Sequence, residues 1–189
     1  MRHLHIVMPM AGEGSRFKKE GWTTPKPLIE LNGKPLFLHA ISSVAAPGIE
    51  LKYSFIVRQE HIKEYEIDKG IKNILPKANI FSVAKTTRGA VETCLVAESA
   101  IADDDAVIVM DCDLEFRSKK FLEIILSILK QPVDFAEGGA LVSFQSTDPG
   151  YSYAALGGNG YVTKTAEKEP ISNNALCGAY FFSTGKRFK

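Results

Sequence analysis

Two carboxylates follow an apolar run in the middle of the chain. Ala106–Met110 is uninterrupted by polar residues, and Asp111 and Asp113 come directly after it. Such a run is typical of a central strand covered on both faces, and open α/β sheets bind ligands at the carboxyl ends of such strands. Mg²⁺ prefers oxygen ligands and often takes one or two carboxylates plus substrate phosphates. Because residues i and i+2 of an extended chain share a face, we expect both carboxylates to approach one ion.

A second group of candidate residues follows the first apolar segment, His3–Met8. Gly12 and Gly14 lack a Cβ, so their backbone N–H groups can approach phosphate oxygens closely. Arg16 adds a permanently charged fork that can bind phosphate bidentately. The segment lacks the third glycine of a dinucleotide-binding fingerprint and the Gly-Lys-Ser/Thr of a P-loop. Taken alone, the two glycines are equally compatible with a plain tight turn.

A lysine flanked by prolines comes next, in Pro25-Lys26-Pro27-Leu28. Each proline fixes its own φ and disfavours helix at the preceding residue, so we expect Lys26 in a stiff, extended stretch. A lysine held in this way keeps its ammonium group aimed at one point. The alternative is a solvent-exposed lysine in a proline-rich turn.

These segments together carry a resemblance to a known family. Gly12-x-Gly14-x-Arg16-Phe17, Pro25-Lys26-Pro27-Leu28-Ile29 and Asn32-Gly33-Lys34-Pro35-Leu36 resemble the signature of the sugar-phosphate nucleotidyltransferases. The family joins an NTP to a sugar phosphate or alditol phosphate and releases pyrophosphate. The resemblance implies that the loop of Ala11, Gly12 and Gly14 wraps the triphosphate while Arg16 and Lys26 hold its charge.

The resemblance assigns the remaining site residues and the cofactor, Mg²⁺. Asp113, followed by Leu114-Glu115-Phe116, matches the metal-binding acid that ends a family strand, and Asp111 is then an accessory ligand or a structural acid. Thr87 and Gly89 are expected at the nucleotide base, although Thr87 is also a candidate helix cap. The residues expected at the sugar phosphate are Glu167, Lys168, Asn174 and Gly178.

Other protein classes share parts of this pattern. A glycosyltransferase that uses a nucleotide sugar also carries Asp-x-Asp on a related fold, and a haloacid-dehalogenase-type phosphatase has Asp-x-Asp-x-Thr/Val after a strand. That phosphatase motif normally lies near the amino terminus, and Glu115 takes the Thr/Val place here. The glycine-bearing loop favours a nucleotidyltransferase over both. A regulatory module of the same fold that binds nucleotides without turnover stays open.

Apolar patterning predicts an α/β fold. Short apolar segments alternate with helical patterns through the first two-thirds of the chain, which indicates βαβ units and a mostly parallel sheet. We expect one domain over residues 1–189, a Rossmann-like three-layer α/β/α sandwich with a mixed sheet, of the nucleotide-diphospho-sugar transferase type. Many family members have a second Mg²⁺ aspartate farther along, so the resemblance predicts a C-terminally truncated form. The expected strands are 3–8, 53–57, 79–83, 106–110, 140–145, 154–156, 161–165 and 179–183, and the expected helices are 35–44, 90–101 and 121–129.

Composition excludes several classes. Lys plus Arg (23) nearly balances Asp plus Glu (22), which argues against a nucleic-acid partner. Cys94, Cys112 and Cys177 fit free thiols in a cytoplasmic protein rather than a disulfide framework. No apolar run approaches the roughly 18 residues of a membrane span. The expected partners are an NTP and a sugar phosphate, and a homo-oligomer is compatible with the family.

Overall fold

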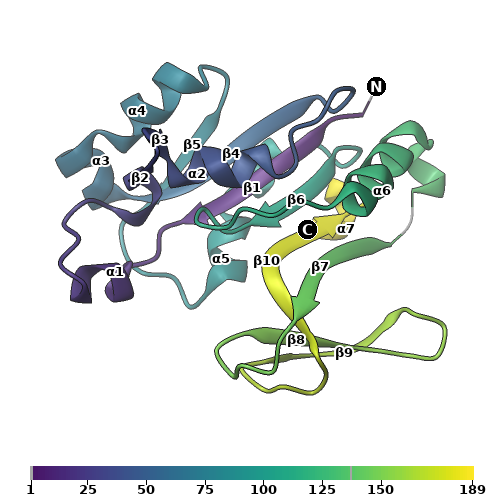
Figure 1. Cartoon of the computed structure of the whole chain (residues 1–189). Helices are drawn as coiled ribbons and strands as arrows, with labels where there is room; N and C mark the ends of the chain where they lie inside the picture. The colour runs from purple at the N-terminus through teal and green to yellow at the C-terminus, as the bar shows by residue number, and fades with distance from the viewer. Residues whose placement is uncertain (1, 137) are drawn as a thin grey trace.

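A mixed β-sheet forms the centre of the computed structural model, which describes residues 2–136 and 138–189 (Figure 1). Within those residues the sheet has eight strands, and seven of them follow the order β5-β4-β1-β6-β10-β8-β9, with β7 also paired to β10. The strands from β5 to β6 run parallel, and β10 is antiparallel to β6. The parallel strands are β1 (Leu4–Met10), β4 (Leu51–Arg58), β5 (Asn79–Val83) and β6 (Ala106–Met110). The others are β7 (Gly139–Gln145), β8 (Ser152–Leu156), β9 (Val162–Glu167) and β10 (Asn174–Phe182).

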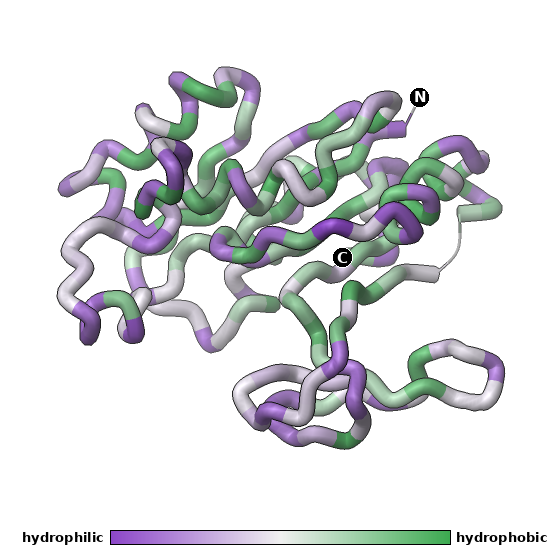
Figure 2. The backbone as a smooth tube through the Cα atoms, in the orientation of Figure 1, coloured by the Kyte–Doolittle hydropathy of each residue, from purple (hydrophilic) through white to green (hydrophobic). Residues whose placement is uncertain are grey.

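Helices cover both faces of the sheet, which confirms the predicted three-layer sandwich. One face packs against α2 (Leu36–Ser42), α4 (Ile67–Ile74) and α6 (Lys119–Lys130). The other packs against α5 (Ala90–Leu95) and the residues that follow it, with α7 (Gly185–Phe188) alongside. Figure 2 shows hydrophobic residues concentrated along the central strands and polar residues on the outer turns of the helices. None of the described helices has the length and apolar character needed to cross a bilayer.

Most predicted elements are present, with one correction. The helix expected over 90–101 ends at Leu95 and continues as the 3₁₀ turn Glu98–Ala100. Val96 N–H already bonds the carbonyl of Thr93, an i→i+3 bond that tightens the turn. The elements that the sequence did not predict are α1 (Ser15–Lys19), the 3₁₀ turn η1 (Lys26–Leu28), β2 (Glu30–Leu31), β3 (Lys34–Pro35), α3 (Gln59–Tyr65), α4, the 3₁₀ turn η3 (Val133–Phe135) and α7.

A glycine bends β10 where it passes the end of β6. The β10–β7 register shifts between Leu176 and Tyr180, and Gly178 between them has φ +86°. A Cβ at Gly178 would overlap the Asp111 carboxylate. The Gly178 carbonyl in turn accepts a hydrogen bond from Asp111 N at 3.0 Å. Only glycine takes up this backbone conformation without strain while leaving room for the carboxylate.

A buried polar cluster lies at the opposite, amino-terminal ends of the parallel strands. His5 is fully buried, with Nε2 2.8 Å from Ser54 Oγ and Nδ1 3.6 Å from an oxygen of Asp105. Lys52 Nζ contacts the same Asp105 oxygen at 2.9 Å. Burial lowers the pKa of His5, although the Asp105 carboxylate opposes that shift. Burial therefore favours the neutral imidazole of His5.

The lowered pKa of His5 predicts a pH-dependent stability. Below about pH 6.5 the unfolded chain protonates His5 while the folded protein keeps it neutral, so the unfolded state binds more protons. The free energy of unfolding should therefore fall as the pH decreases through this range, with His61, whose pKa burial also lowers, adding to the slope. Urea unfolding at pH 7.5 and 5.5 measures the slope. His5→Gln should make it shallower, and an unchanged slope would contradict the assignment.

The bend at Gly178 predicts a costly substitution. Gly178→Ala should lower the free energy of unfolding by about 2 kcal/mol, because it adds backbone strain and a clash with Asp111. Gly158→Ala is the matched control, since a Cβ at Gly158 would meet nothing within 4 Å. Urea unfolding of both variants tests the expectation. Equal stabilities would show that β10 tolerates a side chain at this bend.

Candidate active site

A cleft of about 740 Å³ opens at the carboxyl ends of β1 and β6. It brings together three segments that are far apart in the sequence: the first loop, the Pro-Lys-Pro segment and the carboxylates after β6. Open α/β sheets bind ligands at this edge. The predicted site residues that line the cleft are Gly12, Gly14, Arg16, Lys26, Asp111, Asp113 and Gly178.

The first loop contributes glycines and an arginine. Gly14 has φ +62° and precedes the short helix α1, so the chain turns sharply there. Arg16 is exposed on α1 and forms no ion pair with any residue that the structure describes. Its guanidinium group is therefore available to a ligand in the cleft.

Lys26 is held on a stiff support. Pro25 and Pro27 are buried, and Leu28 N–H bonds the Pro25 carbonyl at 2.8 Å to close a 3₁₀ turn. The Lys26 ammonium group reaches Asp113 Oδ2 at 2.7 Å and lies 5.9 Å from the centre of the Phe17 ring. Both members of the ion pair are about 30% exposed, so solvent weakens the attraction and the pair adds little to stability. The prediction that Lys26 lies in an extended stretch is wrong, because Lys26 begins the 3₁₀ turn η1. Its side chain lines the cleft.

Asp111 carries a charge that the protein compensates poorly. Burial raises the pKa of Asp111, and the negative charge of Asp113 raises it further, whereas Lys26 opposes the shift. Asp111 N–H is held by the Gly178 carbonyl, so the carboxylate stays beside β10. Among the described residues, Lys26 is the cation that pairs with these acids, and a bound cation would stabilise both carboxylates further.

The carboxylates fit the predicted magnesium ion as a partial ligand set. No cluster of three or more His, Cys, Asp or Glu side chains able to hold a metal occurs among the described residues. Mg²⁺ suits such a pair because it keeps several waters and takes substrate phosphates as further ligands. Asp113 and Asp111 would hold the ion.

The opposite wall of the cleft is aromatic, and the sequence did not predict it. Phe144 on β7 and Tyr151 before β8 pack edge to face with ring centres 5.0 Å apart, and both are about 40% exposed. Tyr180 on β10 also lines the cleft, and burial raises its pKa, so its hydroxyl stays protonated at neutral pH. These residues meet only through the antiparallel pairing of β7, β8 and β10, and no local motif announces them.

Several predicted residues do not line the cleft. On the nucleotide side, Ala11 is buried, and Thr87 donates to the Gly89 carbonyl at 3.1 Å. Gly89 itself precedes α5 as its cap residue, so Thr87 is not the cap. The assigned nucleotide roles of these residues remain predictions.

The residues expected at the sugar phosphate also lie mostly outside the cleft. The Lys168 side chain is 70% exposed, and its Nζ lies 3.6 Å from Glu167 Oε1. The Lys168 backbone has φ +56°. The Asn174 amide contacts Gln145 and the Ala154 carbonyl instead. Only Gly178 of this group lines the cleft. The predicted roles of Glu167, Lys168 and Asn174 are therefore not supported by their positions and stay predictions.

Known proteins share both sequence and fold with this chain. It is 36% identical over 107 residues to 2-C-methyl-D-erythritol 4-phosphate cytidylyltransferase of Chromobacterium violaceum, covering 56% of this chain and 44% of that protein. It is 34% identical over 101 residues to mannose-1-phosphate guanyltransferase of Yarrowia lipolytica, covering 51% and 26%. The chain thus matches less than half the length of these curated relatives.

A solved structure matches over almost the whole chain. The nucleoside-diphosphate-sugar pyrophosphorylase of Vibrio cholerae superposes with a TM-score of 0.76 at 28% identity, covering 98% of this chain and 75% of that one. The family model for nucleotidyl transferases matches residues 5–186, which include the glycine-bearing loop, Lys26 and both cleft carboxylates. The chain belongs to the nucleotidyl transferase family.

Proposed function

We propose that this chain transfers a nucleotidyl group from an NTP to a sugar phosphate or alditol phosphate and releases pyrophosphate, with Mg²⁺ as cofactor. The observation that carries the proposal is the 2.7 Å contact between Lys26 and Asp113 inside a cleft that also holds Arg16 and the glycine-bearing loop. A triphosphate is the ligand that needs cations, loop N–H groups and a metal-binding acid at one place.

The charges of the cleft suit an in-line displacement. A phosphate oxygen of the acceptor attacks the α-phosphorus of the NTP, the bond between that phosphorus and the bridging oxygen breaks, and pyrophosphate leaves with the electron pair. Arg16 and Lys26 stabilise the charge that develops on the leaving group. Mg²⁺ bound by Asp113 and Asp111 would supply further positive charge and orient the phosphates. Lys26 would exchange its bond to Asp113 for one to a phosphate oxygen.

The reaction needs no general base from the protein. A phosphate monoester is largely dianionic near neutral pH because its second pKa is about 6. No histidine lines the cleft within the described part of the chain, and the mechanism requires none. The work left to the protein is to hold two anions close together and to exclude water.

The aromatic wall suits the sugar or alditol part of the acceptor. Phe144 and Tyr151 offer partly exposed rings against which the C–H face of a polyol can pack. Ser152 and Tyr180 add hydroxyl groups that can bond those of the substrate. The acceptor phosphate would then point toward the α-phosphorus of the NTP.

A pyrophosphate-release screen tests the proposal. The chain is assayed with each of four NTPs against sugar phosphates and alditol phosphates in the presence of Mg²⁺, and with nucleotide sugars as alternative donors. Release that requires both an NTP and an acceptor, and that EDTA abolishes, is the expected result. Turnover of a nucleotide sugar without NTP would support a glycosyltransferase instead. NTP binding without release under any combination would support a non-catalytic module.

A substitution at Asp113 tests its proposed role as a metal ligand. Asp113→Asn should lower pyrophosphate release by a factor on the order of 100, because it removes the charge that holds the ion. Folding should be little affected, since the pair with Lys26 is partly exposed. Glu115→Gln is the matched control, because Glu115 pairs with His39 at 3.3 Å and lies outside the cleft lining. Equal rates for the two variants would contradict the role of Asp113.

The lysine should act on the triphosphate rather than on the acceptor. Lys26→Ala should lower kcat/KM for the NTP roughly tenfold or more, as expected for a lost bond to a charged group. The KM for the acceptor should change much less. Lys19→Ala, an exposed lysine of the same segment that does not line the cleft, serves as control. A loss confined to the acceptor KM would reverse the assignment.

A further inference from the structure

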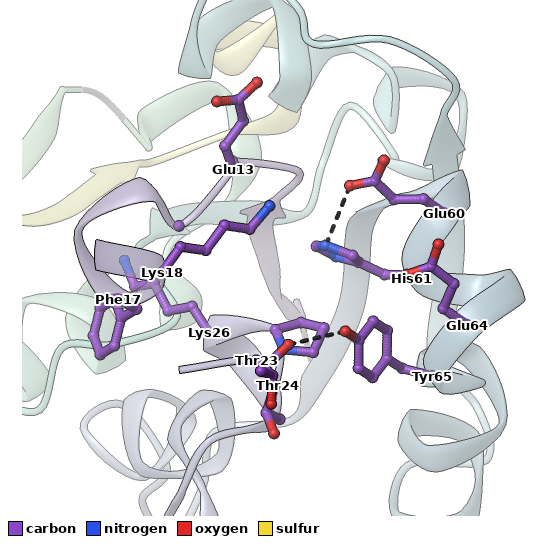
Figure 3. A pocket seen from close by; sticks show the side chains of 13 residues that line it. Glu13, Phe17, Lys18, Thr23, Thr24, Lys26, Glu60, His61, Glu64 and Tyr65 are labelled. Carbon is purple, nitrogen blue, oxygen red and sulfur yellow. Dashed lines mark hydrogen bonds and ion pairs between the residues drawn. The ribbon is translucent and has the colours of Figure 1, made fainter. Parts of the chain in front are cut away.

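A second, much smaller cavity of about 50 Å³ lies between the glycine-bearing loop and α3 (Figure 3). Its walls come from the loop on one side and from α3 on the other, and it shares Gly12, Gly14, Phe17 and Lys26 with the large cleft. A gap of this size holds no more than a few water molecules. It leaves the loop and α3 without close packing against each other over this area.

The loop has few attachments to the body of the protein. The helix α1 buries none of its residues, and the turns after it bond within the segment, as in Trp22 N–H to the Phe17 carbonyl at 3.0 Å. Among the hydrogen bonds of the described residues, one joins residues 15–24 to another element: Tyr65 Oη donates to the Thr23 carbonyl at 2.9 Å. Figure 3 shows this bond crossing from α3 to the loop beside the cavity.

Tyr65 is itself firmly placed. It is the last residue of α3, which directly follows the central strand β4. Its ring meets the His61 ring edge to face with centres 6.1 Å apart, and the His61 side chain is only 8% exposed. Tyr65 is 40% exposed, and its hydroxyl reaches from the end of α3 to a loosely attached segment.

Thr23 lies close in sequence to Lys26, the lysine that pairs with Asp113 in the cleft. After Thr23 come Thr24 and then the stiff Pro25-Lys26-Pro27 segment. Only Thr24 separates Thr23 from the proline-bounded turn, so the bond at Thr23 fixes the direction from which the chain enters that turn. We propose that Tyr65 is a positioning residue whose hydroxyl, by holding Thr23, sets where the Lys26 ammonium group stands relative to Asp113. The proposal rests on the proposed function through the role given to Lys26.

Tyr65→Phe tests the hydroxyl alone, because the ring and its packing on His61 are kept. We expect kcat/KM for the NTP to fall roughly fivefold, which corresponds to the loss of one ordinary hydrogen bond. The KM for the acceptor and the urea midpoint should stay close to those of the unchanged protein. Tyr161→Phe makes the same chemical change at a residue 74% exposed outside both cavities and should have no effect. Equal kinetics for the two variants would overturn the proposal.

Two further measurements separate a positioning role from a general structural one. In a Lys26→Ala background, Tyr65→Phe should have almost no additional effect on kcat/KM, since the hydroxyl acts through that lysine. Full additivity would show that Tyr65 acts elsewhere.

The second measurement does not depend on activity. Trp22, the sole tryptophan, sits next to Thr23 and is 48% exposed, so its fluorescence anisotropy reports loop mobility. The anisotropy should fall in Tyr65→Phe and not in Tyr161→Phe. If the unchanged protein releases no pyrophosphate, the proposed function fails, but the anisotropy still tests whether the Tyr65 hydroxyl holds the loop at Thr23. An anisotropy that is unchanged in Tyr65→Phe would refute that role.

Discussion

Charge balance at the carboxyl end of β6 is the constraint on which the rest of the cleft depends. Burial and the negative charge of Asp113 raise the pKa of Asp111, and Lys26, which pairs with Asp113, opposes that shift. A partly exposed pair of this kind contributes little to stability, so folding does not explain its presence. An arrangement with surplus negative charge and an exchangeable lysine is instead suited to receive a cation and an anion together.

The supports around these charges differ in stiffness. The carboxylates follow a buried strand, and Gly178 lets β10 pass close enough for its carbonyl to hold the Asp111 backbone. Lys26 stands on a buried, proline-bounded turn. The glycine-bearing loop and α1, by contrast, are exposed and loosely attached. The charged groups thus stand on buried elements, whereas the loop beside them is exposed and forms few bonds to other elements.

Local sequence signals predicted most of the fold and the charged half of the cleft. The runs that became β1, β4 and β6 are apolar and short, and α6 has strong helical spacing, so burial decides their structure with little outside influence. The loop glycines, Lys26 and the carboxylates were recognisable because each motif is local and its chemistry is in its residue types. The helix α4 was missed although Ile67, Ile71 and Ile74 repeat at helical spacing, a signal that could have revealed it.

The aromatic half of the cleft was not predictable in the same way. Phe144 and Tyr151 become neighbours through a turn and the pairing of β7 with β10 and of β10 with β8, and strand register cannot be read from either segment alone. The pairing of β9 with β8 likewise places Glu167 at the end of the edge strand β9, with Lys168 next to it, outside the cleft lining. The sequence motif around Glu167 and Lys168 identifies this segment, but it does not show whether the two side chains face the cleft.

The two ends of β6 show how the fold separates stability from chemistry. Asp105, just before the strand, is 2% exposed and pairs with Lys52 at 2.9 Å, with the His3 and His5 rings beside it, so Lys52 balances its charge. Asp111, just after the strand, faces a second carboxylate. Both acids flank the same strand, yet only Asp111 lies beside another carboxylate whose negative charge a bound cation could offset.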